Sequence, residues 1–157
     1  VKFSQNWIKE KRKIAKMKHR QMKSRNELHH EISHAITEKF GRIAVEDLNI
    51  KGMTSSAEGT LEEPGKMVKQ KAGLNRSILE MGWGKFVSQL EYKSEWKGGE
   101  LIKVDPKNTI RICSVCGFTD EKNRKTQDKF QCISCGHTEN ADVNASKNIL
   151  SRMNQLN

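Results

Sequence analysis

The first forty residues predict one long helix, and in its second half hydrophobic positions recur every three to four residues. Neither proline nor glycine interrupts residues 4–40, and strong helix formers dominate the stretch. In its second half the apolar side chains share one helix face, which we expect to be buried. They are Leu28, Ile32, Ala35, Ile36 and Phe40. Gly41 follows directly and is a candidate C-cap.

The next apolar run is short and has the composition of a β-strand. Residues 42–48, RIAVEDL, carry apolar side chains at Ile43, Val45 and Leu48 and predict a strand. A polar stretch follows at residues 51–66, and its composition is typical of an exposed, mobile loop.

A second helix is expected after this loop. Asn75 is a candidate N-cap, and the helix would run over residues 76–96. Its apolar side chains would supply core material, and we expect Trp83 and Trp96 to lie in that core.

The remaining pattern predicts a second strand and a last helix. Residues 98–106, GGELIKVDP, turn into a strand that Pro106 ends. A helix is expected over residues 141–153. The order helix, strand, helix, strand indicates an α/β layer.

Charge is high and unevenly distributed in this chain of 157 residues. Only 34% of residues are hydrophobic and 31% are charged, so the core is expected to be modest. The net charge is +10, and residues 1–25 hold ten lysines or arginines against the single acid Glu10. Such a stripe binds polyphosphate by counterion release, although a solvated helix face is the plainer alternative. The residues that we expect to contact nucleic acid are Lys11, Arg12, Lys13, Lys16, Arg20, Arg25, Arg124 and Lys125.

Four cysteines form the most specific motif in the chain. They are spaced as two C-x2-C pairs, CSVCG and CISCG, separated by fifteen residues: Cys113, Cys116, Cys132 and Cys135. Four thiolates at this spacing satisfy tetrahedral zinc and predict a closed structural site, a zinc ribbon. Two disulfides are the alternative, which a reducing compartment disfavours. His137 is a fifth candidate ligand that the four cysteines make unnecessary, and we expect it to be a surface residue or a nucleic-acid contact.

Two acids stand in positions that suggest a second metal site. Glu46 lies within the apolar strand, where burial is costly unless the carboxylate is paired or binds a cation. Asp47 would point to the opposite face of the same strand. Asp142 lies where the last helix begins, so capping is its plainer role. Asn144 and Asn148 nearby would allow close approach to a neighbouring backbone or ligand.

Residues 30–34, HEISH, match the H-E-x-x-H pattern of zinc metalloproteases. The pattern also needs a third ligand, and the following residues lack the glycine and histidine of one large class. We interpret His30, Glu31 and His34 as ordinary helix residues and the motif as fortuitous.

Several segments, in order, resemble the C-terminal half of TnpB, a transposon-encoded RNA-guided DNA endonuclease of the OrfB family. They are HHEISHAITEKFGRIAVEDLNIKGM, NRSILEMGWGKFVSQLEYKSEWKGGELIKVDPKNT, and the cysteine pairs followed by HTENADVNASKNIL. The resemblance spans residues 8 to 150. It departs from the family at NTIRIC, where Thr-Ser-Gln usually precedes the first cysteine.

This resemblance implies a partial RNase H-like (RuvC) α/β domain with an inserted zinc ribbon. Residues 1–109 would be RuvC-like with a long basic helix, residues 110–139 the ribbon, and residues 140–157 a completing helix. Glu46 and Asp142 match the second and third catalytic acids, which would bind magnesium. The family's first catalytic aspartate, in a Gly-Ile-Asp-Leu-Gly-like turn, has no match, so the chain is expected to be inactive alone.

The sequence therefore leaves three hypotheses. The first is the catalytic portion of an RNA-guided nuclease with structural zinc and catalytic magnesium, whose partners are DNA, guide RNA and an N-terminal half of the same nuclease. The second is a non-catalytic nucleic-acid-binding zinc-ribbon protein. The third is a metallopeptidase. No apolar run of membrane-spanning length and no signal peptide occur, which predicts a cytoplasmic protein.

Overall fold

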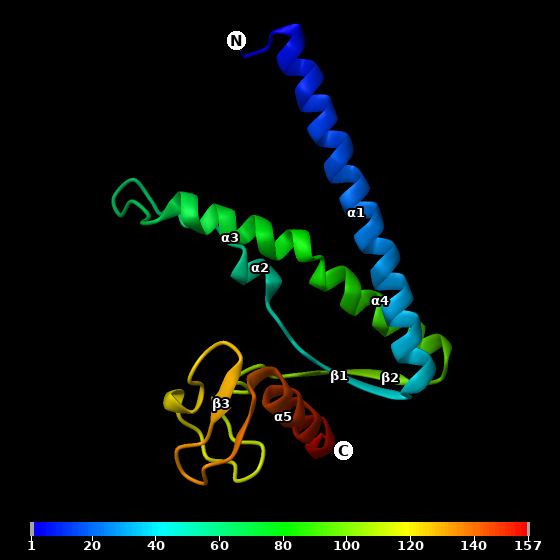
Figure 1. Cartoon of the computed structure of the whole chain (residues 1–157), viewed down its shortest axis with the longest axis vertical. Helices are drawn as coiled ribbons and strands as arrows, with labels where there is room; N and C mark the ends of the chain where they lie inside the picture. The colour runs from blue at the N-terminus through cyan, green and yellow to red at the C-terminus, as the bar shows by residue number, and fades with distance from the viewer. Residues whose placement is uncertain (1, 157) are drawn as a thin grey trace. The chain divides into compact units, whose positions relative to one another are not determined.

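The computed structural model describes residues 2–156, which form two compact units, each built from two stretches of the chain (Figure 1). A helical unit combines the residues up to Gly41 with Ile50–Gly99. An α/β unit combines Arg42–Asn49 with the residues from Glu100 onward. None of the helices within residues 2–156 is both long enough and apolar enough to span a bilayer.

The first helix, α1, runs from Gln5 to Lys39, as the uninterrupted pattern predicted. Ser4 caps it, because its Oγ accepts a hydrogen bond from the Trp7 amide at 3.2 Å. The predicted Gly41 cap is wrong. Phe40 is the C-cap and has an extended backbone at φ −129°, since the chain passes directly into a strand and makes no left-handed turn.

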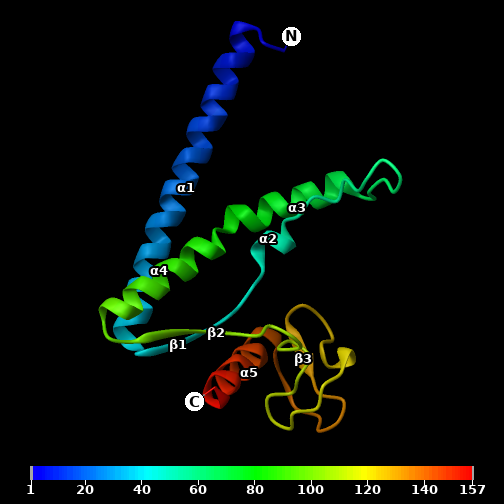
Figure 2. The same ribbon diagram turned by 180° about the vertical axis from the view of Figure 1, so that it is seen from behind.

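The face of α1 that packs on α4 (Trp83–Trp96) is polar, which contradicts the predicted apolar face. Ser33 and Thr37 are its buried residues, whereas Leu28 is 51% exposed. Ser33 Oγ lies 3.4 Å from Gln89 Oε1 and accepts from Lys93 Nζ at 2.7 Å. Small hydroxyl side chains permit a close helix–helix approach, so this polar seam takes the place of an aliphatic one. Figure 2 shows α1 and α4 side by side.

The predicted helix over residues 76–96 is two helices. α3 runs from Val68 to Met81, and α4 begins at Trp83. Gly82 separates them with a left-handed backbone at φ 69°, and a Cβ placed there would lie 3.3 Å from the His29 Cε1 atom. Both facts favour glycine at this junction.

Asn75 is not an N-cap but an interior residue of α3. Its Nδ2 donates to the carbonyls of Thr54 and Ser55, each at 2.9 Å. These bonds fix the segment that follows the short helix α2 (Ile50–Met53) onto α3. Part of the stretch predicted as a loop is therefore ordered by side-chain hydrogen bonds.

The tryptophans are less buried than the sequence suggested. Trp96 is 79% exposed and contacts Tyr92 edge-on with ring centroids 4.7 Å apart, so its assignment to the core is wrong. Trp83 is half-buried beside Phe86. The buried apolar residue of α4 is Leu90.

Two parallel strands form the sheet of the α/β unit. β1 (Arg42–Glu46) pairs with β2 (Glu100–Val104) in register, Arg42 opposite Glu100 and Glu46 opposite Val104. The Asp47 amide extends the ladder by donating to Val104 O at 2.8 Å. Both predicted strands are confirmed, and Pro106 lies just beyond the second.

The last helix, α5, runs from Ala141 to Gln155 and packs on β1 and β2. Asn140 is its cap, since Asn140 Oδ1 accepts from the amides of Asp142 and Val143 at 2.9 and 3.2 Å. Capping is therefore not the role of Asp142. Between β2 and α5 lie the 3-10 helix η1 (Glu121–Asn123) and the antiparallel hairpin of β3 (Lys129–Gln131) and β4 (Thr138–Asn140).

We expect Leu90→Ala to destabilise the helical unit by about 2–5 kcal/mol, because Leu90 is only 2% exposed and truncation leaves a cavity. All three tryptophans, Trp7, Trp83 and Trp96, lie in this unit, so urea unfolding followed by tryptophan fluorescence reports on it. Leu74→Ala is the matched control, since Leu74 is 55% exposed and should change the free energy of unfolding by under about 0.5 kcal/mol. Equal effects of the two substitutions would contradict this packing.

Candidate functional site: a four-cysteine metal centre and two acids

The four cysteines converge in a geometry that suits one metal ion. Their sulfur atoms all lie within 4.8 Å of one another, with Cys113 Sγ 3.7 Å from Cys135 Sγ and Cys116 Sγ 3.6 Å from Cys132 Sγ. A tetrahedron of thiolates around zinc has sulfur atoms about 3.8 Å apart, whereas a disulfide requires about 2.05 Å. All four are free cysteines, so the residues fit a metal and not two disulfides.

Two of the thiols, Cys132 and Cys116, have pKa values shifted in opposite directions, by backbone hydrogen bonds and by their thiol neighbours. Backbone hydrogen bonding from Cys135 lowers the pKa of Cys132 to about 7. The Phe118 amide lowers the pKa of Cys116, but the neighbouring thiols and burial outweigh it and raise that pKa to about 12. A bound cation would remove this conflict, because it stabilises all four thiolates together.

Tight turns and a buried asparagine build the ribbon. Gly117 and Gly136 follow the two cysteine pairs with left-handed backbones at φ 75°, a conformation that glycine adopts without strain. Asn123 is fully buried and joins the two halves. Its Nδ2 donates to Arg111 O at 2.9 Å, and its Oδ1 accepts from the Ile133 amide at 3.0 Å. Nothing in its sequence surroundings distinguishes Asn123 from a loop residue.

The first turn of α5 is part of the ribbon core. Ala141 clusters with Cys113, Cys132 and Phe130, all nearly inaccessible to solvent. Phe130 thus supports the ribbon's hydrophobic face. The Ala141 amide also donates to Asp128 O at 2.8 Å, so the start of α5 is fixed to the ribbon at two points.

Two buried asparagines on α5 bind the backbone that enters the ribbon. Asn144 Nδ2 donates to Ile112 O at 2.8 Å, and Asn144 Oδ1 accepts from the Ser114 amide at 3.0 Å. Asn148 Nδ2 donates to Thr109 O and Ile112 O, both at 2.8 Å. Close approach to a neighbouring backbone was one expectation for these residues, and the structure confirms it.

Glu46 is the last residue of β1, and its carboxylate is half-buried. Thr109 Oγ1 lies 2.6 Å from Glu46 Oε1, and Thr109 itself is buried. No other hydrogen bond or ion pair to the Glu46 side chain is found in the described part of the chain, so Oε2 remains available to a cation. Asp47, next along, is exposed.

Asp142 lies in the first turn of α5 with an exposed carboxylate. Among residues 2–156 no group hydrogen-bonds to that carboxylate. On the helix Asp142 shares a stripe with Ala145 and Met153, which are buried, so it lies at one end of the packed face.

The two acids therefore share one unit, and the packed elements β1 and α5 carry them. Within residues 2–156 the one group of three or more close metal-binding side chains is the four cysteines. Glu46 and Asp142 do not complete a three-ligand site with another described side chain.

The histidines of the H-E-x-x-H pattern lie on the exposed surface of α1. His30 and His34 are exposed, and His34 Nε2 lies 3.9 Å from Glu38 Oε1. His29 is the half-buried one, packed against the Phe86 ring at 5.1 Å, and burial together with Arg25 lowers its pKa. In residues 2–156 no third ligand joins His30 and His34.

His137 is less exposed than predicted. Its ring packs near Phe130, with centroids 6.5 Å apart, and its Nε2 lies 3.4 Å from Glu139 Oε2. The hydrogen bond from Lys147 lowers the pKa of Glu139, and His137 contributes to the same shift. His137 therefore contacts both strands of the hairpin, Phe130 in β3 and Glu139 in β4.

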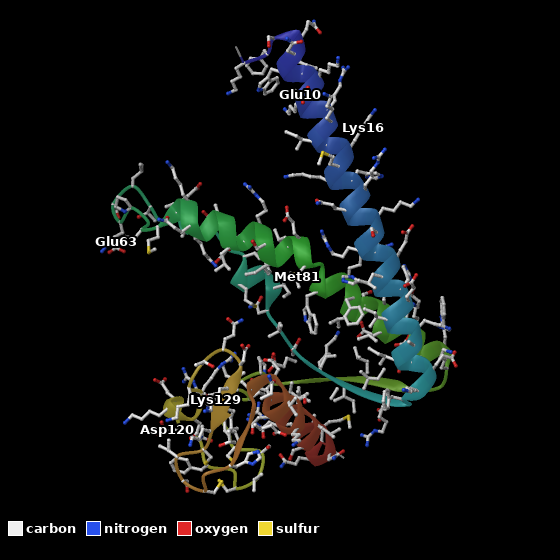
Figure 3. The ribbon with its side chains drawn as sticks, viewed as in Figure 1. Glu10, Lys16, Glu63, Met81, Asp120 and Lys129 are labelled. Atoms are coloured by element: carbon white, nitrogen blue, oxygen red, sulfur yellow. The ribbon has the colours of Figure 1, made fainter. Side chains whose placement is uncertain are left out.

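The predicted nucleic-acid residues of α1 extend outward from the helix. Figure 3 shows Glu10 and Lys16 projecting into solvent. Arg12, Lys16 and Arg20 follow one another at a spacing of four residues, so they form one exposed stripe. Lys13 instead pairs with Glu10 at 2.7 Å, and Lys11 lies 4.9 Å above the Trp7 ring.

Residues 18–25 of α1 border a groove of about 640 Å³, which α3 and residues 54–58 also line. Lys18, Arg25 and Arg76 give it basic side chains, and acids are also present among its lining residues. The groove is therefore mixed in charge and less distinctly basic than the exposed stripe of α1.

The two basic residues predicted beside the ribbon differ in their environment. The Arg124 guanidinium donates to Gln127 O at 2.9 Å and to Thr126 O at 3.4 Å, so it holds its own loop together. Lys125 is exposed and remains the better placed of the two for contact with phosphate.

Two family models match the chain. The one described as "Cas12f1-like, TNB domain" matches residues 83–149, and the one described as "Probable transposase", OrfB_IS605, matches residues 1–57.

Individual relatives agree with these matches. The Escherichia coli K12 protein "Putative RNA-guided DNA endonuclease InsQ" is 44% identical over 151 residues, which are 96% of this chain and 38% of that protein. The "TnpB-like protein L79" of Acanthamoeba polyphaga mimivirus is 29% identical over 79% of this chain and 22% of its own length. The "Cryo-EM structure of the Cas12f1-sgRNA-target DNA complex" superposes with a TM-score of 0.55 at 26% identity, over 87% of this chain and 35% of that chain. The chain thus spans well under half the length of the relatives it matches.

We expect the protein to bind one zinc ion and Cys132→Ser to lose it, because three thiolates no longer close the tetrahedral site. Metal content by elemental analysis, together with thermal unfolding by circular dichroism, measures both the loss and the resulting destabilisation. Ser114→Ala is the matched control, since it removes a buried hydroxyl that has no partner among the described residues. Full zinc content in Cys132→Ser would refute the site, and a second zinc that His30→Ala removes would favour the H-E-x-x-H alternative.

Proposed function

The chain belongs to the TnpB-like family of transposon-associated proteins, as its sequence motifs indicated, and we propose that it is the portion of an RNA-guided DNA endonuclease that supplies two metal-binding acids, Glu46 and Asp142. Its α/β unit would then form part of an RNase H-like (RuvC) domain, and its partners would be DNA and guide RNA. An RNA-guided activity on cellular DNA would place the protein inside the cell.

One observation carries the proposal. Glu46 ends β1 and Asp142 begins α5, two elements that pack together, and both carboxylates keep oxygen atoms free of other partners within residues 2–156. Carboxylates at the carboxyl end of a strand and at the start of an adjacent helix are suited to hold hard divalent cations.

Magnesium is the cofactor that fits these oxygen ligands, and when bound it would activate water and stabilise the leaving oxygen of a phosphodiester. The chain's own residues would hold it, with Glu46 presenting Oε2 and Asp142 presenting its exposed carboxylate. The family's first catalytic acid lies in a Gly-Ile-Asp-Leu-Gly-like turn that residues 1–157 do not contain, so the complete set of three acids requires a further segment.

Zinc would have a structural role in this scheme. The closed four-thiolate site leaves no open coordination position for chemistry, but it fixes the ribbon to which the first turn of α5 is attached. The exposed basic stripe of α1 would contact nucleic-acid phosphates.

We expect Glu46→Gln and Asp142→Asn each to lower magnesium-dependent DNA cleavage by roughly 100-fold or more, because each removes a charged metal ligand. The assay uses a nuclease that contains this chain together with the rest of the family's length and its guide RNA. Each variant should retain its zinc and its unfolding midpoint.

Asp47→Asn is the matched control, because it neutralises the adjacent exposed acid on the opposite face of the strand. Cleavage should be unaffected by it. Full cleavage by the Glu46→Gln and Asp142→Asn variants would contradict the proposal.

The charge of α1 favours a second candidate function, a nucleic-acid-binding module that does not cut. We expect the triple substitution Arg12→Gln, Lys16→Gln, Arg20→Gln to reduce the slope of log affinity against log salt by about 2–3, since three phosphate contacts are lost. Fluorescence anisotropy with labelled DNA and RNA over a salt series measures the slope. Glu46→Gln serves as the control, because it should leave the slope unchanged; a slope that the triple substitution does not alter would remove α1 from the interface.

A further inference from the structure

Thr109 makes the one hydrogen bond that the described residues offer to the Glu46 carboxylate. Thr109 is 1% exposed, and its Oγ1 lies 2.6 Å from Glu46 Oε1 although the two residues are 63 positions apart in the sequence. A distance of 2.6 Å falls within the range of a hydroxyl that donates to an ionised carboxylate. The bond therefore leaves one oxygen of Glu46 fixed and the other free.

The hydroxyl proton of Thr109 has two possible acceptors. Thr109 Oγ1 also lies 3.0 Å from Pro106 O. A hydroxyl carries one proton, so it can donate to only one of these oxygens at a time. The shorter distance and the charge of the carboxylate favour Glu46.

The turn that carries Thr109 is held by α5. Asn148 Nδ2 donates to Thr109 O at 2.8 Å, and the Arg152 guanidinium donates to the carbonyls of Asp105 and Lys107. Within the turn Asn108 takes a left-handed backbone at φ 61°, which is uncommon for residues other than glycine. Several independent contacts thus determine the position of the Thr109 hydroxyl.

We propose that Thr109 is a positioning residue for the metal site: its hydroxyl holds Glu46 Oε1 so that Oε2 faces the cation shared with Asp142. The turn transmits this position from α5, the helix that also carries Asp142. The inference rests on the proposed function and adds to it a residue that contacts neither metal nor substrate. Outer partners of this kind set the orientation of metal-binding carboxylates.

A purely structural role for Thr109 makes a different prediction. If the hydroxyl served only to satisfy Pro106 O, its removal would alter stability but not the affinity of Glu46 for a cation. The two roles are therefore separated by cation binding measured on a folded variant.

The test titrates a nuclease that contains this chain together with the family's first acid with Mn²⁺, a paramagnetic substitute for magnesium, and follows NMR line broadening around Glu46 and Asp142. Thr109→Val keeps the shape of the side chain and removes the donor, so we expect the apparent Kd for Mn²⁺ to rise roughly tenfold or more. Thr109→Ser restores the donor and should restore the affinity. Thr119→Val is the matched control, since Thr119 is an exposed ribbon threonine. Zinc content and amide spectra confirm that each variant is folded.

Two outcomes are distinguished by including Glu46→Gln. If Glu46→Gln abolishes the broadening but Thr109→Val leaves the Kd unchanged, the positioning role is overturned and the proposed function stands. If the unaltered protein shows no broadening at either acid up to millimolar Mn²⁺, or Glu46→Gln has no effect, the proposed function fails and this inference fails with it.

A second measurement needs no variant and no metal. A Thr109 hydroxyl proton that donates to Glu46 should exchange slowly with water and show a scalar coupling to the Glu46 carboxylate carbon. A coupling to the Pro106 carbonyl carbon instead would overturn the positioning role even if Thr109→Val does not fold.

Discussion

The α/β unit depends on the hydrogen bonds that α5 makes to the chain entering the ribbon. Asn144 and Asn148, one helical turn apart, satisfy donors and acceptors of the backbone between Thr109 and Ser114. A two-stranded parallel sheet is too small to be stable by itself, and buried backbone groups left unpaired would each cost about 1–3 kcal/mol. Side-chain amides can supply a donor and an acceptor together, which explains why asparagine and not an aliphatic residue faces this backbone.

This arrangement links the two candidate metal centres mechanically. Ala141 packs among ribbon residues, Asp142 follows it directly, and the turn that presents Thr109 to Glu46 is held by the same helix. The integrity of the ribbon therefore sets where α5 begins. Helix α5 therefore helps to position both acids, although Glu46 and Asp142 come from distant parts of the sequence.

Sequence reasoning succeeded where a pattern has few physical alternatives. The sequence correctly predicted the cysteine cluster, the two strands and the helices α1 and α5. It also indicated the family correctly. It failed where tertiary contacts outweigh local preference. The prediction of a buried apolar face on α1 was wrong, because a polar seam around Ser33 is buried instead. The break between α3 and α4 at Gly82 was not predicted. Thr109 and Asn123 carry no local signal, since a buried polar side chain is defined by its partners, and those partners lie far away in the sequence. The proposed catalytic roles of Glu46 and Asp142 rest on the resemblance to the family, because residue chemistry alone left capping and pairing open as alternatives.

The pairing of β1 with β2 also has a consequence for biosynthesis. Arg42 and Glu100, which begin the ladder, are 58 residues apart, and the intervening chain belongs mostly to the helical unit. During translation β1 emerges well before its partner, so both of its edges remain unpaired while α1, α3 and α4 are being made. Local helix contacts form faster than a parallel pair of such separation. The sheet, and with it the position of Glu46, is therefore expected to be completed late, after β2 has left the ribosome.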